Sequence, residues 1–241
     1  MAKTHIKEFN FPAGKVIASK YEIIECIGSG WEGEVYKVQE VGTNVLRAAK
    51  FYLPQRNIKN KTASLYAKKL YKLRNYPIVI QYINQETIQF HGEKITLLIT
   101  DFIEGETLHE FLKRQKGKRM DVLNALVLLH KLVLGIMDMH GSKEYHGDLH
   151  SKNILIKPYG LGYDVKVLDM FDYGPPKVKD FKDDLCDLIK IFHECLGGRK
   201  HYAKQPPMVK EICLGLKKNL ILKKFRNLTS LKVYLENLEW D

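Results

Sequence analysis

The chain has 241 residues, of which 45% are hydrophobic and 28% charged, and its formal net charge is +11 at pH 7. This composition and length suit a folded globular protein of one large domain or two small ones, and they exclude an intrinsically disordered chain. We find no apolar run near the ~20 residues that cross a bilayer and no signal-peptide core in residues 1–10, which indicates a cytoplasmic protein, in its own cell or in a host.

Five segments of the N-terminal half have the alternating pattern or the residue types of β-strands. They cover residues 21–27, 35–41, 44–53, 80–90 and 94–100, after a Phe-Pro-Ala-Gly opening at residues 11–14. These segments predict a five-stranded β-region.

One helix is predicted between the third and fourth strands. Its apolar residues recur at helical spacing and form one stripe: Ala63, Tyr66, Ala67, Leu70 and Leu73. The same stretch is basic and holds no acid between Lys50 and Glu86, with Arg56, Lys59, Lys61, Lys68, Lys69, Lys72 and Arg74. A solvated helix face is the simplest interpretation, and an acidic protein or a membrane surface is the alternative partner. Nucleic acid is disfavoured, because no nucleic-acid-binding motif accompanies the charge.

The periodicity becomes helical after residues 101–105. Asp121 is the expected N-cap of a long helix over residues 122–139. A second helix is predicted over residues 181–196, where a glycine pair follows and stops it.

Two further helical segments are predicted near the C-terminus. The Pro206-Pro207 pair begins the first, and Thr229 is the expected N-cap of the second, which ends near Trp240. Four cysteines in the chain form no CxxC pair and no zinc-ligand spacing: Cys26, Cys186, Cys195 and Cys213. This pattern suits a reducing compartment, and we expect small buried side chains with free thiols.

Two motifs carry residue types that phosphate chemistry uses. The loop Gly28-Ser29-Gly30-Trp31-Glu32-Gly33 joins the first two strands, and Lys50 lies on the third. Further on, His146-Gly147-Asp148-Leu149-His150-Ser151-Lys152-Asn153 is followed, after one short hydrophobic strand, by Asp169. Phosphoryl transfer needs one carboxylate for the incoming hydroxyl, and an Asn plus an Asp to hold magnesium.

These motifs, in this order and at this spacing, resemble the protein kinase superfamily from about residue 11 to about residue 237. The resemblance implies an α+β, bilobal fold with a five-stranded antiparallel small lobe, one helix in that lobe, and a reduced, mostly helical large lobe. It implies a single kinase-like domain over residues 1–241. The small lobe would cover about 11–100, the hinge about 101–105 and the large lobe about 106–241.

The resemblance also assigns the nucleotide contacts. ATP and Mg²⁺ are the implied cofactors, with Lys50 reaching the α- and β-phosphates. Glycines would let the loop backbone approach the phosphates, and these are Gly28, Gly30 and Gly33. The adenine would be covered by Val35 and Ala48, supported by Leu155, and paired at its edge by the backbone of Asp101 and Ile103.

For the catalytic loop, the resemblance makes Asp148 the base for the substrate hydroxyl. Asn153 and Asp169 would hold magnesium, a hard cation that prefers oxygen ligands. His146 is expected to be a packed scaffold residue and not a metal ligand.

Several positions depart from the family pattern. Gly147 stands where many protein kinases have an arginine, and His150 replaces a lysine, as in small-molecule phosphotransferases. Ala67 stands where the helix glutamate usually pairs with the nucleotide lysine, so we expect Asp169 to pair with Lys50, with Glu32 and Glu34 as alternatives. The segment over residues 169–184 is short and has no Ala-Pro-Glu motif.

The expected activity is transfer of the γ-phosphate of ATP to serine or threonine on a protein. A small-molecule kinase is the first alternative, favoured by the glycine and histidine of the catalytic loop. A nucleotide-binding pseudokinase scaffold is the second, favoured by Ala67 and the basic helix, although a scaffold needs no general base such as Asp148.

Overall fold

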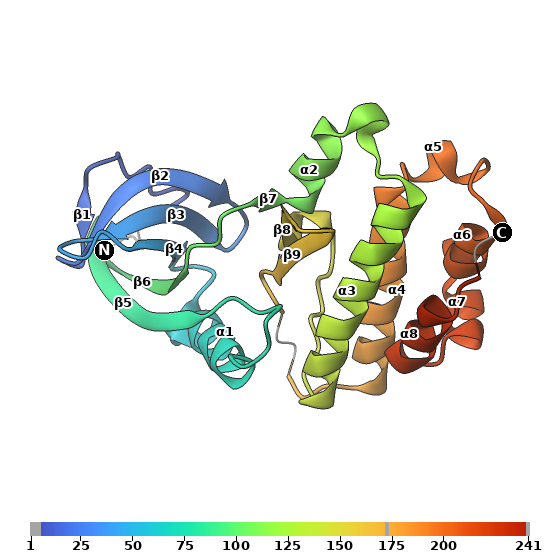
Figure 1. The fold of residues 1–241 in the computed structure, drawn as a ribbon. Helices are drawn as coiled ribbons and strands as arrows, with labels where there is room; N and C mark the ends of the chain where they lie inside the picture. Colours follow the sequence, from blue (N-terminus) through green and yellow to red (C-terminus); the bar gives the residue numbers. More distant parts are fainter. Residues whose placement is uncertain (1–5, 172–173, 240–241) are drawn as a thin grey trace. The chain divides into compact units, whose positions relative to one another are not determined.

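The computed structural model describes residues 6–171 and 174–239. The chain divides into two compact units (Figure 1), an N-terminal unit up to Asn75 together with Ile80–Ile103, and a C-terminal unit of Tyr76–Val79 and the chain from Glu104 onward. The boundary at residues 103 and 104 falls inside the segment predicted as a hinge.

An antiparallel sheet of six strands forms most of the N-terminal unit, in the order β1-β2-β3-β4-β6-β5. The strands are β1 (Val16–Ile17), β2 (Tyr21–Ser29), β3 (Gly33–Glu40), β4 (Leu46–Tyr52), β5 (Tyr82–Phe90) and β6 (Glu93–Asp101). The five longer strands are the predicted ones, and each end lies within two residues of its expected position. The sixth, β1, was missed because two residues are too few to show an alternating pattern.

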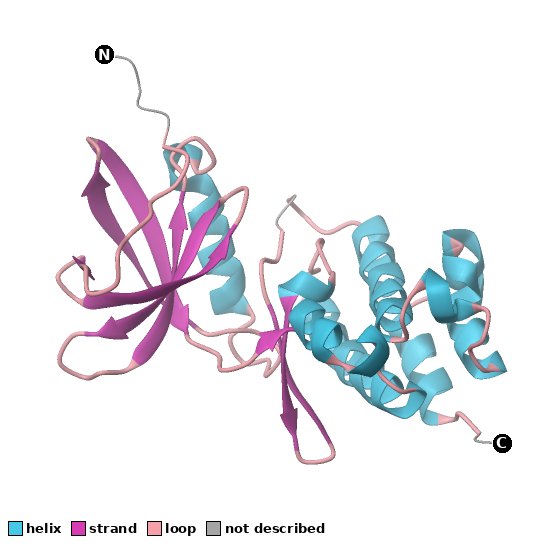
Figure 2. Cartoon of the chain, turned by 90° about the horizontal axis from the view of Figure 1, so that it is seen from above, coloured by secondary structure: helices cyan, strands magenta, loops and turns pink. Residues whose placement is uncertain are grey.

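The position of strand β6 explains why four of the five residues from Ile95 to Ile99 are apolar and why Thr96 among them is buried. The strand lies between β4 and β5, and helix α1 (Lys61–Lys72) packs against β5 and β6 on one face (Figure 2). Ile95, Leu97 and Ile99 join the hydrophobic core cluster, and the alternation of a strand points the buried Leu98 to the opposite face. Both faces of this strand are therefore covered.

An aromatic cluster and a buried carboxylate fasten the segment before β1 to the sheet. Phe9 and Phe11 pack against the ring of Phe51, with centroids 5.6 and 5.0 Å apart. The backbone N–H of Phe9 donates to Glu34 Oε1 at 3.1 Å, and that of Phe11 donates to the Tyr36 hydroxyl at 3.1 Å. The Tyr36 hydroxyl in turn donates to Glu34, and burial together with this hydrogen bond raises the pKa of Tyr36.

Helix α1 buries the predicted stripe and exposes most of its lysines. Ala63, Tyr66, Ala67 and Leu70 are buried, as is Leu73 just past the helix end. Lys61, Lys68 and Lys72 are exposed on the opposite face. Lys69, which we expected to be part of the basic surface, is only 4% exposed, because it lies at the border of the buried stripe.

The C-terminal unit is mostly helical. Its helices are α2 (Leu108–Arg114), α3 (Val122–Gly141), α4 (Val178–Cys195), α5 (Arg199–Tyr202), α6 (Pro207–Cys213), α7 (Lys218–Lys224) and α8 (Leu228–Glu236). Helix α3 packs against α4 and α8 (Figure 1). A small antiparallel sheet joins them, with strands β7 (Glu106–Thr107), β8 (Ile154–Tyr159) and β9 (Gly162–Val167).

The predicted helix ends are correct in part. Asp121 caps α3, because its carboxylate accepts from the N–H of Asn124 at 2.9 Å, and this hydrogen bond lowers the pKa of Asp121. Helix α4 begins three residues earlier than predicted, where the Asp180 carboxylate accepts from the N–H of Lys177 at 2.7 Å. The cap of α8 is Asn227 and not Thr229, since Asn227 Oδ1 accepts from the N–H of Ser230 at 2.9 Å. Trp240 lies outside the described residues.

Helix α3 corrects one expectation from the sequence, because it is long and apolar enough to cross a membrane by length and composition. The sequence has no unbroken apolar run here, because Asn124, Lys131 and Asp138 interrupt the apolar residues without ending the helix. Eight of its residues are buried within the C-terminal unit: Ala125, Leu126, Leu128, Leu129, Leu132, Val133, Ile136 and Met139. A core helix of a folded unit meets the same criterion, so this helix is weak support for a membrane span.

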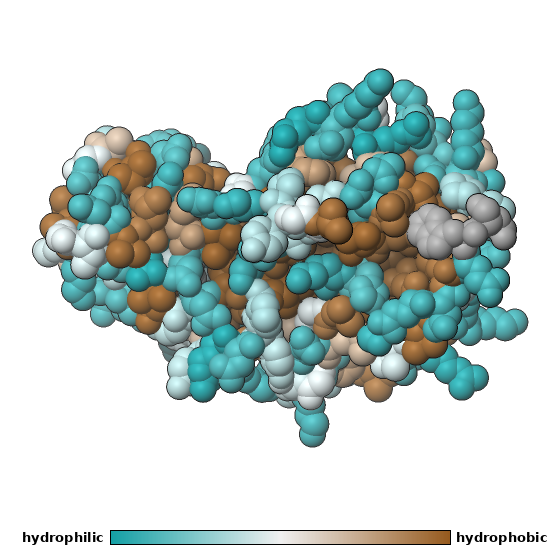
Figure 3. All heavy atoms as spheres, in the orientation of Figure 1, coloured by the Kyte–Doolittle hydropathy of each residue, from teal (hydrophilic) through white to brown (hydrophobic). Residues whose placement is uncertain are grey.

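On the face drawn in Figure 3, hydrophilic side chains project from both units, and apolar side chains are visible among them on the surface of each. All four cysteines are free thiols, and three are buried as expected, whereas Cys26 on β2 is exposed. Burial raises the pKa of the Cys213 thiol to about 12.

The attachment of the N-terminal segment can be tested with Tyr36→Phe. This change removes the acceptor of the Phe11 N–H and one donor to Glu34, both in a buried setting. We expect the free energy of unfolding to fall by about 1–3 kcal/mol in urea titrations. Tyr71→Phe, on the exposed side of α1, is the control and should change it by less than about 0.5 kcal/mol. Equal stability of the two variants would contradict this account.

Candidate active site

The glycine-rich loop forms the tip of the β2–β3 hairpin. Gly28 is opposite Val35 in the sheet register, and the N–H of Gly30 donates to the carbonyl of Gly33 at 2.9 Å. A Cβ atom at Gly33 would lie 1.8 Å from the carbonyl oxygen of Phe51, so no side chain fits there. At Gly28 the nearest atom would be 3.9 Å away, and at Gly30 none lies within 4 Å. Of these three loop glycines, Gly33 is therefore the one that packing requires.

Lys50 lies on the same face of the sheet as two of the predicted adenine contacts. Residues two apart on a strand share a face, which places Ala48 beside Lys50 on β4, and Val35 on β3 is opposite Lys50. Ala49 and Phe51 point to the other face, into the aromatic core. The alternation thus separates the core from a face that carries Val35, Ala48 and Lys50.

The ammonium of Lys50 is paired inside the N-terminal unit. Its Nζ lies 2.7 Å from Glu32 Oε2, and the rings of Tyr52 and Tyr66 are 5.2 and 5.4 Å away. We expected Asp169 first and named Glu32 only as an alternative, because a glycine-loop residue gives no local sign of pointing toward β4. Asp169 belongs to the C-terminal unit, and its pairing with Lys50 stays a prediction.

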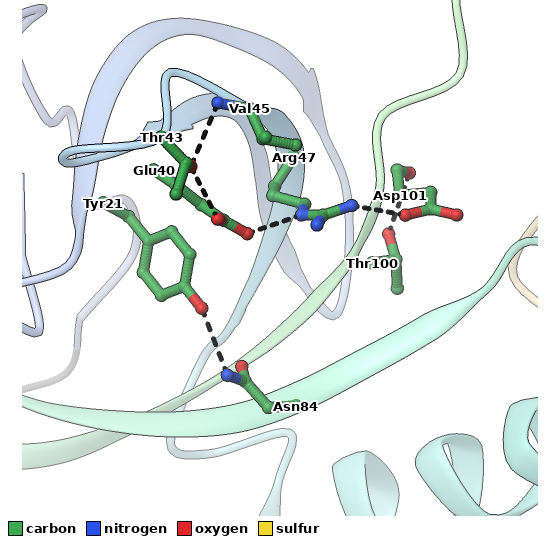
Figure 4. Close-up of polar contacts among 8 residues, drawn as sticks. All are labelled: Tyr21, Glu40, Thr43, Val45, Arg47, Asn84, Thr100 and Asp101. Carbon is green, nitrogen blue, oxygen red and sulfur yellow. Dashed lines mark hydrogen bonds and ion pairs between the residues drawn. The ribbon is translucent and has the colours of Figure 1, made fainter.

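The two residues expected at the adenine edge lie at the end of β6 and just past it: Asp101 is its last residue, and Ile103 follows two residues later. The N–H of Asp101 donates to the carbonyl of Gln81 at 3.0 Å. The carbonyl of Asp101 accepts from the Thr100 hydroxyl at 3.4 Å and has a second lone pair for a ligand. Its carboxylate accepts from Arg47 Nη1 at 2.6 Å, and Arg47 Nε donates to Glu40 at 2.7 Å (Figure 4). This hydrogen bond lowers the pKa of the Glu40 carboxyl. Ile103 follows as the last residue of the unit.

A buried carboxylate in the C-terminal unit holds the candidate catalytic loop. Asp184 on α4 is 0% exposed and accepts the N–H groups of His146 at 2.8 Å and Gly147 at 2.9 Å. His140 Nε2 lies 3.0 Å from the same carboxylate. His146 is fully buried, as predicted for a scaffold residue.

Gly147 has a structural reason to be glycine. Its φ is +80°, and a Cβ atom there would lie 2.9 Å from the ring of Tyr145. The sequence indicated only that an arginine is missing at this position. The backbone geometry shows that a side chain at Gly147 would be strained.

Asp148 and Asn153 are joined by hydrogen bonds. The amide of Asn153 donates to the Asp148 carbonyl at 3.0 Å and to its carboxylate at 3.2 Å. His150 Nε2 lies 3.6 Å from the carboxylate of Asp148, and His150 Nδ1 accepts from the N–H of Lys152 at 3.2 Å. A neutral His150 therefore carries its proton on Nε2, the nitrogen that faces Asp148.

The segment around Asp169 is tied to the same loop on both sides. The N–H of Leu168 donates to the carbonyl of Asn153 at 2.9 Å, and that of Phe171 donates to the carbonyl of His146 at 2.9 Å. Asp169 itself has φ +51°, a left-handed conformation that aspartate tolerates better than most residues. The C-terminal unit thus brings Asp148, Asn153 and Asp169 together, while Leu155 lies close by on β8.

These residues can hold magnesium only in combination with other oxygen donors. Within residues 6–171 and 174–239, no group of three His, Cys, Asp or Glu side chains forms a metal site. Asn153 and Asp169 would supply two oxygen ligands, and Mg²⁺ is commonly bound by one or two carboxylates with phosphate and water oxygens. The chemistry of the pair therefore fits Mg²⁺ that arrives with a nucleotide.

Comparisons with known proteins agree with this geometry. The family described as "Protein kinase domain" matches residues 21–180. Mouse myosin-IIIa is 30% identical over 170 residues, which are 66% of this chain and 10% of that protein. The probable serine/threonine-protein kinase YbdM of Bacillus subtilis is 24% identical over 220 residues, 86% of this chain and 84% of YbdM. The chain therefore spans about a tenth of the myosin and most of the bacterial protein.

A solved structure shows the same fold. The crystal structure of the PF14_0431 kinase domain has a TM-score of 0.64 and 16% sequence identity, and the match covers 78% of this chain and 67% of that one. The α+β fold predicted from the sequence, with an antiparallel sheet and one helix followed by a helical part, is confirmed.

The role of Asp184 can be tested with Asp184→Asn. An amide presents one oxygen where the carboxylate presents two, so one of the loop N–H groups loses its acceptor. We expect the free energy of unfolding to fall by about 2–4 kcal/mol, and amide exchange at His146 and Gly147 to become faster. Asp164→Asn, at an exposed position on β9, is the control. Unchanged exchange at both amides in the Asp184 variant would refute this role.

Proposed function

The chain belongs to the protein kinase family, and on that premise we propose that it transfers the γ-phosphate of ATP to serine or threonine hydroxyls on a protein. The observation that carries the proposal is the set of Asp148, Asn153 and Asp169, held on one loop system by Asp184 and by backbone hydrogen bonds. This set contains the base and the two metal ligands that phosphoryl transfer needs.

In this proposal, Asp148 orients the substrate hydroxyl and accepts its proton. Asn153 fixes the carboxylate of Asp148 through its amide nitrogen, while its amide oxygen remains able to bind a cation. Asp169 supplies the second oxygen ligand. When bound, Mg²⁺ neutralises charge on the phosphates and orients them.

The nucleotide contacts proposed for the N-terminal unit lie on the face of the sheet that carries Val35, Ala48 and Lys50. Lys50 would bind the α- and β-phosphates, and Gly28 and Gly30 would leave the loop backbone open to them. Glycine at these two positions is not required by packing, which favours a ligand as the reason for it. Val35 and Ala48 would cover the adenine, Leu155 would support it, and the Asp101 carbonyl and the backbone of Ile103 would pair with its edge.

Serine or threonine on a protein is favoured over other acceptors by the relatives. YbdM, which this chain matches over most of both lengths, is named a probable serine/threonine-protein kinase. The small-molecule alternative rests partly on Gly147, but the positive φ at that residue gives a backbone reason for glycine that is independent of the substrate. The pseudokinase alternative rests on Ala67, but Lys50 has a carboxylate partner without any acid on α1.

The basic surface is a candidate contact for a partner. Lys61, Lys68 and Lys72 are exposed along one side of α1, and Arg56 and Lys59 are exposed just before it. An acidic protein or an anionic membrane surface fits this charge, and a solvated helix face remains the simpler interpretation.

A single experiment separates the three functions. The purified protein is incubated with labelled ATP, Mg²⁺, and generic protein and small-molecule acceptors. Label on serine or threonine of a protein supports the proposal. Label on a small molecule supports the first alternative, and nucleotide binding without any transfer supports the scaffold.

The division of roles between the two aspartates predicts different defects. Asp148→Ala should abolish transfer and leave ATP binding nearly intact, because this residue serves the acceptor. Asp169→Ala should also weaken Mg²⁺-dependent nucleotide binding. Calorimetric titration with Mg-ATP and a transfer assay measure the two properties. Full activity of the Asp148 variant would remove it as the base.

The position of Ala67 provides a second test. Ala67→Glu should give little gain in turnover, because Lys50 already has a carboxylate partner and because Ala67 lies in the buried stripe of α1. Lys50→Ala should lower turnover by on the order of 10²-fold, the usual cost of removing one charge-stabilising donor. Steady-state kinetics of both variants measures the turnover. A large gain in turnover from Ala67→Glu would indicate that the native protein is a defective kinase, and would favour the pseudokinase scaffold.

A further inference from the structure

The tip of the glycine-rich loop is fastened to β4 and the segment after it at three points. The carbonyl of Glu32 accepts from the N–H of Leu53 at 2.9 Å. The carboxylate of Glu32 binds Lys50 at 2.7 Å, and the guanidinium of Arg56 stacks over the ring of Trp31 at 3.8 Å. Two of these contacts are made by side chains at the tip of the hairpin, those of Trp31 and Glu32. The loop tip is therefore packed against β4, the strand that carries Lys50, and against the segment after it.

Lys50 is largely buried. Its side chain is 13% exposed, and the rings of Tyr52 and Tyr66 lie near the ammonium. Helix α1 contributes Tyr66 and the buried Ala67 on this side, and its sequence from Lys61 to Lys72 contains no acid. The carboxylate of Glu32 therefore reaches Lys50 from the loop, and α1 contributes none.

The origin of this carboxylate matters because the loop is also the element proposed to cover the phosphates. An acid on the helix could bind Lys50 from one side while phosphates bind it from another. A carboxylate carried by the loop tip approaches Lys50 from the loop side, where the phosphates would also have to lie. Two anions placed within a few ångströms of each other repel, and they repel more strongly in a partly buried site than in water.

We propose that Glu32 is an internal competitor of the nucleotide, whose carboxylate occupies Lys50 until the phosphates of ATP displace it. This inference rests on the proposed nucleotide role of Lys50. Binding of ATP then includes the breaking of the Lys50–Glu32 pair and the lifting of the loop tip. The affinity for nucleotide is set partly by the strength of that pair.

The inference predicts that removing the charge of Glu32 strengthens nucleotide binding. We expect Glu32→Gln to lower the dissociation constant of Mg-ATP about tenfold, equivalent to about 1.4 kcal/mol. Glu32→Asp, which keeps the charge but draws the carboxylate back by one methylene, should give a smaller gain. Glu25→Gln is the matched control, since it removes the same charge from an exposed residue of the same unit that contacts Lys37 at 3.8 Å.

The experiment is calorimetric titration of the full chain and its variants with Mg-ATP and Mg-ADP, after thermal melts show that each variant is folded. Trp31, which is 65% exposed at the loop tip, offers a second signal. In a Trp240→Phe background, its fluorescence should change when nucleotide binds the parent and change less in Glu32→Gln.

The outcomes separate this inference from the proposed function. Equal or weaker nucleotide binding by Glu32→Gln, with the parent binding normally, overturns the inference and leaves the proposed function standing. Weaker binding would make Glu32 a permanent positioning partner of Lys50. If neither the parent nor any variant binds nucleotide, the proposed function fails and this inference fails with it. If Glu32→Gln does not fold, Glu32→Asp decides by the same criterion.

Discussion

The hydrogen bonds that the buried Asp184 accepts are the constraint on which the candidate catalytic loop depends. A carboxylate that is shielded from solvent needs hydrogen-bond donors. The loop supplies two backbone N–H groups to Asp184, and His140 Nε2 lies within hydrogen-bond distance of the same carboxylate. The loop is thereby held against α4, the helix that also packs against the long core helix α3. Asp148 and Asn153 follow directly along the same loop, so their placement depends on Asp184, a residue more than thirty positions further along the chain.

The N-terminal unit uses the two faces of one sheet for different purposes. One face is packed with aromatic rings and closed by the segment around Phe9 and Phe11, while the other carries Lys50 beside Val35 and Ala48. The strict alternation of a β-strand enforces this separation, because a shift of register by one residue would place the lysine in the aromatic core. The packing of the aromatic face therefore fixes the strand register, and with it the face to which Lys50 points.

The pairing of Lys50 with Glu32 changes how the missing helix acid is understood. Judged from the sequence, Ala67 shows that the acid beside Lys50 must come from outside the helix, with Asp169 preferred and Glu32 and Glu34 as alternatives. In the structure the acid comes from another element, and α1 is held by apolar packing through residues such as Tyr66 and Leu70. A helix without an acid and a loop with one are together consistent with a working site in which the loop controls access to the lysine.

The sequence alone determined the longer strands, the main helices and the motifs, and only the tertiary structure decided how the charged groups pair. The strands, α1 and the Asp121 cap depend on local periodicity and local hydrogen bonds, which neighbouring residues reveal. The partner of Lys50, the burial of Lys69 and the reason for Gly147 depend on contacts between elements distant in the chain, which leave no local pattern. Charged side chains are long and can reach several partners, and the folded backbone selects among them.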